Sequence, residues 1–184
     1  MDTLEITKCP ACGNPMPHGP AGCPRTLREW IENDIVEGII KREGGHTNDP
    51  QDRGGETIFG ISKKSNPEAW KNGPPTKEQA IEIYTRKYIK PFKGLEGSNC
   101  FEQAVDFGVT SGPTLVIRKI QEIVGAEVDG VIGGETLTKV SAFGKDLNLE
   151  LAKARIKMIG RLVSKDISQV RFLNGWLNRS LEFL

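Results

Sequence analysis

The sequence predicts a mainly α-helical globule with one small β-like loop after its first long helix, an α+β class, preceded by a short cysteine-rich module. After residue 26, apolar residues recur at three- and four-residue spacings, which is the period of an amphipathic helix. Residues 46–62 are turn-rich and then briefly β-like, which favours a loop or small hairpin. Residues 1–25 show neither period and contain three of the four cysteines.

The amino-acid composition and net charge limit the classes of function that the protein can have. With 184 residues, of which 37% are hydrophobic and 27% charged, the chain has room for one compact domain and a small appendage. A formal net charge of +1 argues against a nucleic-acid-binding protein. Residues 151–184 carry seven basic and two acidic residues, a pattern typical of a solvated helical face, with an anionic envelope partner as the alternative.

Two further properties concern membranes. No apolar run approaches the roughly 18 residues that a membrane span needs, so we expect no membrane insertion. The polar N-terminus lacks the basic and apolar regions of a secretory signal. We therefore expect a protein that stays in the cytoplasm until it is released. Separately, we expect it to be a monomer.

The spacing of the apolar residues and the residues suited to helix ends predict where each helix lies. Thr26 is a plausible N-cap for a first helix that Gly44 and Gly45 end. A second helix begins after Thr76 and stops near Pro91. Further helices are expected at residues 101–108, 113–124, 135–143, 146–163 and 168–181.

The N-terminal block, residues 1–25, is too small to bury a core, so it needs a stabilising cross-link or metal ion if it is ordered. Cys9, Cys12, His18 and Cys23 offer three thiolates and an imidazole, which suits a tetrahedral structural zinc site. The alternatives are an unligated tail or a redox-active C-x-x-C pair. No cofactor is expected for catalysis itself.

The segment from Glu43 to Ser62 carries the residue types that glycosidic chemistry needs. Glu43 is expected where the first helix ends, and a turn-rich loop with Asp52 leads to the hydroxyl residue Thr57. Glycosidic cleavage commonly needs one carboxyl group that donates a proton and a second group that stabilises charge or orients a water molecule. Taken singly, Glu43 before two glycines is more typical of a solvated helix end, and Asp52 before Arg53-Gly54-Gly55 is more typical of a plain turn.

Five blocks of sequence, in order, resemble the glycoside hydrolase family 108 muramidases, whose members include phage endolysins. They are the EGG-to-GIS run at 43–62, YTRKYIKP at 84–91, FGVTSG at 107–112, Gln121 with DGVIG at 129–133 and Thr136, and FLNGWLNR at 172–179. The resemblance implies a lysozyme-like fold. It also implies a muramidase domain over residues 26–184, whose residues 100–180 form a peptidoglycan-binding-like helical part in which the DGVIG turn is structural.

By this resemblance Glu43 is the catalytic acid that protonates the departing oxygen. Asp52 steadies the developing positive charge or positions water, and Thr57 holds that water by hydrogen bonds. The implied partner is the glycan strand of peptidoglycan, with no nucleic acid involved.

His46, Tyr84 and Tyr88 are expected to contact the substrate. The sequence departs from the family pattern at three places: His46 follows EGG where an aromatic residue is usual, Ile58–Phe59 replaces an Asn-aromatic pair, and Ile89 replaces a tryptophan. These changes weaken the expected sugar contacts and leave the proposed acid in place.

Three function hypotheses follow. The first is a muramidase that hydrolyses the β-1,4 bond between N-acetylmuramic acid and N-acetylglucosamine, acting as an endolysin. The second is a lytic transglycosylase, in which the same acid works but a hydroxyl group of the sugar closes on the anomeric carbon. The third is a non-catalytic cell-wall-binding or secretion-accessory protein, against which the presence of Glu43, Asp52 and Thr57 together argues.

Overall fold

The computed structural model describes the backbone of residues 27–43, 46 and 56–184, and the side chains from Asp34 onward in those ranges. The chain separates into two compact units, residues 1–68 and 69–184, which are described in turn. The described part is mainly helical with one two-stranded sheet, as the sequence predicts. No helix in these ranges is both long and apolar enough to cross a membrane.

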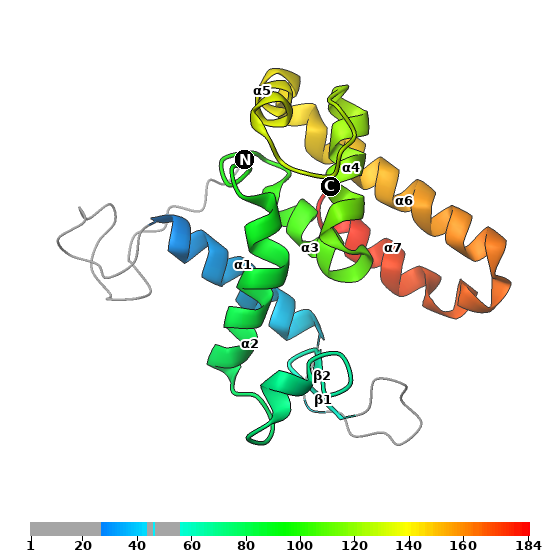
Figure 1. The fold of residues 1–184 in the computed structure, drawn as a ribbon. Helices are drawn as coiled ribbons and strands as arrows, with labels where there is room; N and C mark the ends of the chain where they lie inside the picture. The colour runs from blue at the N-terminus through cyan, green and yellow to red at the C-terminus, as the bar shows by residue number, and fades with distance from the viewer. Residues whose placement is uncertain (1–26, 44–45, 47–55) are drawn as a thin grey trace. The chain divides into compact units, whose positions relative to one another are not determined.

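The first unit contains helix α1 (Leu27–Glu43) and a small β-hairpin (Figure 1). On α1, Ile35, Val36, Ile39 and Ile40 are buried and form the apolar face of the helix. The helix ends at Glu43, as expected. The proposed cap residues on either side, Thr26 and Gly44–Gly45, lie outside the described residues.

The hairpin consists of β1 (Thr57–Ile58) and β2 (Ile61–Ser62), which are antiparallel with Thr57 opposite Ser62. Its two turn residues, Phe59 and Gly60, have φ angles of 52° and 73°. Positive φ at both central positions is what a type I′ turn requires, and it matches the twist of the strands. Phe59 adopts this conformation although it costs a non-glycine residue about 1–2 kcal/mol.

The second unit begins its helical path at α2 (Lys77–Tyr84), where the predicted cap is confirmed. The Gln79 amide donates to the Thr76 hydroxyl at 3.3 Å, and the Thr76 amide donates to the Gln79 side chain at 2.8 Å, forming a capping box.

The expectation of one continuous helix up to Pro91 is wrong in its second half. A π-helical turn (Thr85–Ile89) and a 3-10 turn (Lys90–Phe92) follow α2. The i→i+5 bonding of a π turn places residues five apart over one another. Tyr84 and Ile89 therefore fall on the same face, and both are buried.

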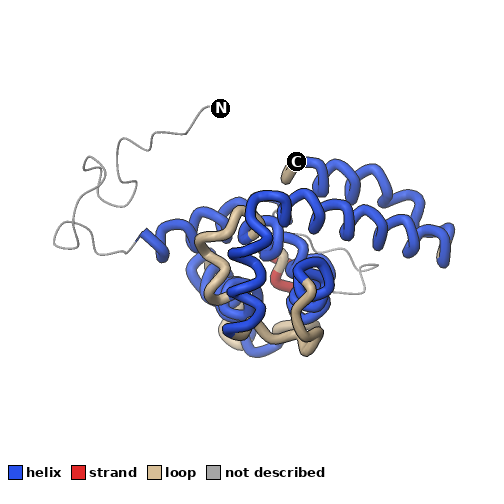
Figure 2. The backbone as a smooth tube through the Cα atoms, turned by 90° about the horizontal axis from the view of Figure 1, so that it is seen from above, coloured by secondary structure: helices blue, strands red, loops and turns tan. Residues whose placement is uncertain are grey.

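Five further helices make up most of the second unit: α3 (Phe101–Ser111), α4 (Pro113–Val124), α5 (Gly134–Phe143), α6 (Leu147–Lys165) and α7 (Leu173–Leu181). Their bounds follow the predicted ranges closely, except that a 3-10 turn (Ile167–Phe172) precedes α7. Helix α4 matches its prediction at both ends, because Pro113 opens it and Gly125, in a left-handed conformation, closes it. Helices α6 and α7 lie side by side (Figures 1 and 2).

Helix α3 is the most buried element of the second unit, with seven of its eleven residues buried. One of them is a charged residue, Asp106, whose side chain is fully buried. It is held by Arg155 of α6, at 2.9 Å, and by Arg179 of α7, whose Nε and Nη2 atoms lie 2.9–3.1 Å from the two carboxylate oxygens. The Arg155 guanidinium also stacks over the Phe107 ring, 5.1 Å from its centroid. A single carboxylate thus joins three helices.

We predict that Asp106→Asn lowers the free energy of unfolding by about 3–5 kcal/mol, because the amide removes the charge that compensates two largely buried guanidinium groups. Urea unfolding followed by circular dichroism measures the change. Asp146→Asn, at an exposed position, is the matched control and should change stability by less than about 0.5 kcal/mol. Equal, small effects of both substitutions would show that Asp106 does not organise the helices.

The DGVIG turn between α4 and α5 is organised by the buried side chain of Gln121. Its amide nitrogen lies 2.7 Å from Asp129 Oδ1 and 3.0 Å from the Val131 carbonyl, and its oxygen accepts from the Gly130 amide at 2.8 Å. Hydrogen bonds from Gln121 and from the Val131 amide hold the pKa of Asp129 below its usual value. These contacts support the structural role that the resemblance implies for the turn.

Two glycines of this region allow a paired test. Gly125 and Gly130 have φ angles of 71° and 83°, but only Gly130 is crowded: an added Cβ would lie 3.0 Å from Thr114 and 3.1 Å from Arg118. We predict that Gly125→Ala costs about 1–2 kcal/mol from backbone strain alone. Gly130→Ala should cost a further 1–3 kcal/mol or so from overpacking. Chemical denaturation of both variants measures the difference, and a smaller loss for Gly130→Ala would contradict the steric explanation.

Candidate active site

Glu43, the predicted acid, is the last residue of α1 and is half-buried. The two residues before it, Lys41 and Arg42, are exposed. The sequence produces this placement because the buried face of the helix ends at Ile40, one turn earlier. Glu43 is therefore neither sealed in the core nor fully in solvent, a position from which a carboxyl group can reach a bound substrate.

Thr57, the predicted water-holding residue, is half-buried in β1 of the hairpin. The turn at Phe59–Gly60 fixes the register of the hairpin, and this register sets Thr57 opposite Ser62. Two hydroxyl residues thus face each other across the strands. The predicted second carboxyl residue, Asp52, lies outside the described residues.

A charged cluster that we call the Glu56 cluster adjoins Thr57. Glu56 Oε1 lies 3.0 Å from His46 Nε2, and Glu56 Oε2 lies 3.8 Å from the Lys63 ammonium group. The Lys63 amide also donates to the Glu56 carbonyl at 2.9 Å, extending the hairpin by one pair. Glu56 is mostly buried, with 25% of its side chain exposed, whereas His46 is 51% exposed.

Neither Glu56 nor Lys63 has a role predicted from the sequence, although the sequence contains a signal for their pairing. The two residues flank a hairpin with a two-residue turn, so they are directly opposite each other, and opposite charges at such positions attract. His46, which we expected at the substrate, contacts Glu56 through one ring nitrogen. About half of the His46 side chain is exposed and can still reach a substrate, so its contact with the substrate stays a prediction.

Tyr84 and Tyr88, the other predicted substrate contacts, belong to the second unit and stack on each other. Their ring centroids lie 5.6 Å apart with an interplanar angle of 38°. Tyr84 is 3% exposed and therefore part of the core, while Tyr88 is half-buried. Of the two rings, Tyr88 is the one with surface that a ligand in solution can reach.

The four predicted zinc ligands, Cys9, Cys12, His18 and Cys23, lie outside the described residues. Over residues 27–43, 46 and 56–184, no group of three or more His, Cys, Asp or Glu side chains is arranged to hold a metal ion. The described site residues Glu43 and Thr57 offer a carboxyl and a hydroxyl group, which suit proton transfer and the orientation of water.

Comparison with known proteins agrees with this chemistry. Residues 36–112 match the family model described as Glycosyl hydrolase 108, and residues 116–181 match one described as a predicted peptidoglycan domain. A solved structure titled "Structure of Brucella abortus SagA" is 27% identical, with a TM-score of 0.63, and the match covers 84% of this chain and 96% of that one. A search of curated protein sequences gives no significant match.

The fold and the matches define a glycoside hydrolase that acts on peptidoglycan. Residues 36–112 belong to the glycosyl hydrolase 108 family, and a peptidoglycan domain follows them. The family region contains both Glu43 and Thr57. Its last helix, α3, is linked to α6 and α7 of the domain that follows by the ion pairs of Asp106 with Arg155 and Arg179.

Proposed function

We propose that the protein is an N-acetylmuramidase, which hydrolyses the β-1,4 bond between N-acetylmuramic acid and N-acetylglucosamine. The observation that carries the proposal is the position of Glu43 at the end of α1 inside the glycosyl hydrolase 108 region, with Thr57 on the hairpin of the same unit. This arrangement supplies a carboxyl group and a hydroxyl group at the ends of two ordered elements.

In the proposed mechanism, Glu43 donates a proton to the bridging oxygen as the glycosidic bond breaks. Asp52 stabilises the positive charge that develops on the sugar, or positions the attacking water. Thr57 holds that water through its hydroxyl group.

The Glu56 cluster supports the choice of Asp52 as the second carboxyl group. Glu56 is adjacent to Thr57 in the chain, which makes it an alternative to Asp52 for this role. However, its two oxygens face His46 and Lys63 at 3.0 and 3.8 Å. A carboxylate engaged by two basic groups is a poor partner for a sugar cation, so we assign Glu56 to holding His46 and Lys63 in place.

We predict that Glu43→Gln lowers the rate of peptidoglycan hydrolysis about 10²–10⁴-fold, since an amide cannot act as a general acid. Turbidity loss of purified cell walls and in-gel clearing measure the rate. Glu37→Gln, on an exposed position of the same helix, is the matched control and should retain full activity. Undiminished clearing by Glu43→Gln would remove Glu43 from the mechanism.

The same digests separate the proposal from its closest alternative. A muramidase leaves muramic acid with a reducing end, whereas a lytic transglycosylase leaves an anhydro sugar. Mass spectrometry of borohydride-treated products distinguishes the two, because only the reducing form is reduced. Anhydro products that disappear with Glu43→Gln would replace the hydrolase proposal with the transglycosylase. The endolysin role, with release from the cytoplasm before cell-wall attack, stays a prediction from the sequence.

We also propose that Cys9, Cys12, His18 and Cys23 bind one structural zinc ion. The support is the ligand chemistry of the sequence, three thiolates and one imidazole in a segment with little apolar surface. Elemental analysis of the purified full chain should give about one zinc per chain. The Cys9→Ser, Cys12→Ser double variant should lose the metal, and the single variant Cys100→Ser, at a buried free thiol, should keep it. A metal-free wild-type protein would contradict the proposal.

A further inference from the structure

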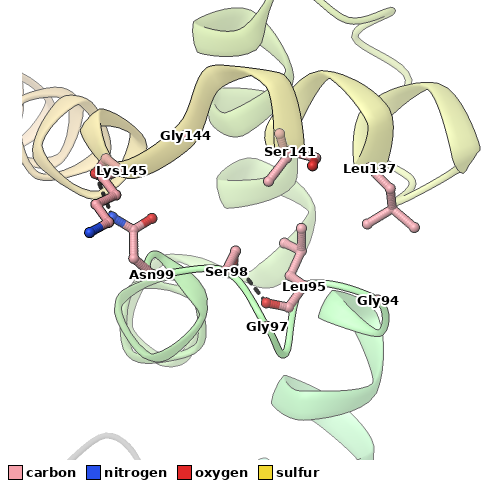
Figure 3. A pocket seen from close by; sticks show the side chains of 10 residues that line it. Gly94, Leu95, Gly97, Ser98, Asn99, Leu137, Ser141, Gly144 and Lys145 are labelled. Carbon is pink, nitrogen blue, oxygen red and sulfur yellow. Dashed lines mark hydrogen bonds between the residues drawn. The ribbon is translucent and has the colours of Figure 1, made fainter.

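A cavity of the second unit lies between the segment after Phe92 and the C-terminal end of α5, and neither Tyr84 nor Tyr88 lines it (Figure 3). It is an open groove of about 420 Å³. Its lining residues are Gly94, Leu95, Gly97, Ser98, Asn99, Leu137, Val140, Ser141, Gly144 and Lys145.

The groove is shaped by a close approach of the two segments. Gly94 has a φ of 99°, and a Cβ at this position would lie only 2.9 Å from the Leu137 side chain. The Asn99 side-chain amide donates to the Lys145 carbonyl, and the Ser98 hydroxyl donates to the Leu95 carbonyl at 2.8 Å. The Ser98 contact closes a turn within the loop, and the Asn99 contact joins the loop to the 3-10 turn (Gly144–Asp146) that follows α5, so the groove is formed before any ligand arrives.

Two polar side chains of the groove remain available for a ligand. Ser141 and Lys145 are exposed, and within the described part of the chain neither side chain takes part in a hydrogen bond or ion pair. The nearby carboxylate of Glu96 is turned to the Gly94 amide, from which it accepts a hydrogen bond at 2.7 Å. Among the ten residues that line the groove, Lys145 is the one with a charged side chain.

The apolar part of the groove is small and aliphatic. Its methyl groups come from Leu95, Leu137 and Val140, and three glycines add no side chains to its walls. None of its ten lining residues is aromatic. A sugar ring gains most from the flat face of an aromatic side chain, which buries a large area at low entropic cost. A peptide with small side chains fits this lining better than a glycan does.

We propose that the groove binds the stem peptide of peptidoglycan. This peptide carries alanine methyl groups that match Leu137 and Val140, amides that match the hydroxyl of Ser141, and free carboxylates that match the ammonium group of Lys145. The groove takes one wall from the glycosyl hydrolase region and the other from the peptidoglycan domain. The inference rests on peptidoglycan as the substrate and is independent of the role of Glu43.

The test is the binding of a fluorescent L-Ala–γ-D-Glu–meso-diaminopimelate–D-Ala peptide to the full chain, measured by anisotropy. Ser141→Trp fills the groove and should weaken binding by at least about tenfold. Lys145→Ala removes one exposed ion pair and should weaken it about two- to fivefold. Lys157→Ala, at an exposed position of α6 outside the groove, is the matched control and should bind like the wild type. Thermal unfolding verifies that each variant is folded.

Two outcomes would overturn the proposal: peptide affinity that both groove variants leave unchanged, or displacement of the peptide by peptide-free N-acetylglucosamine oligomers, which would assign the groove to sugar. Failure here is distinguishable from failure of the muramidase proposal. The Glu43→Gln variant should bind the peptide normally while losing cleavage. Conversely, Ser141→Trp should still cleave glycan strands from which an amidase has removed the peptides.

Discussion

The buried Asp106 carboxylate is the interaction on which the second unit depends. It lies on α3, the most buried helix, and accepts hydrogen bonds from Arg155 on α6 and Arg179 on α7. Other surroundings also favour the charge of the two guanidinium groups. Arg155 stacks over the Phe107 ring and lies 3.5 Å from the Thr110 hydroxyl, while Arg179 keeps 18% of its side chain exposed.

This arrangement explains why the end of the glycosyl hydrolase region and the peptidoglycan domain lie within one compact unit, residues 69–184. Helix α3 closes the glycosyl hydrolase region, and α6 and α7 belong to the peptidoglycan domain. A buried ion cluster adds little stability compared with apolar side chains of the same size, but it strongly penalises any arrangement that separates its members. The cluster therefore specifies how α3, α6 and α7 meet, while the surrounding apolar residues supply most of the stability.

The sequence predicts the features that local chemistry decides. Thr76 and Gln79 signal a helix start, and Pro113 and Gly125 bound α4, because capping and φ preferences depend on neighbouring residues. The π turn after Tyr84 and the partners of Asp106 depend on tertiary contacts up to 73 residues apart, which no local pattern encodes. Glu43 and Thr57 stand out through the family resemblance, whereas the Glu56–Lys63 pair follows from hairpin register once the turn is assigned.

A peptide-binding groove has a consequence for catalysis by the same chain. Binding energy from a part of the substrate that does not react can offset the cost of orienting and distorting the sugar at the bond that breaks. The stem peptide is attached to muramic acid, one of the two sugars at the proposed cleavage site, so its capture restricts the position of that sugar along the strand. Lys145 and Ser141 would then contribute to specificity without touching the reacting atoms. A cell-wall enzyme built in this way would distinguish peptidoglycan from other β-1,4 glycans by the peptide as well as by the glycan backbone.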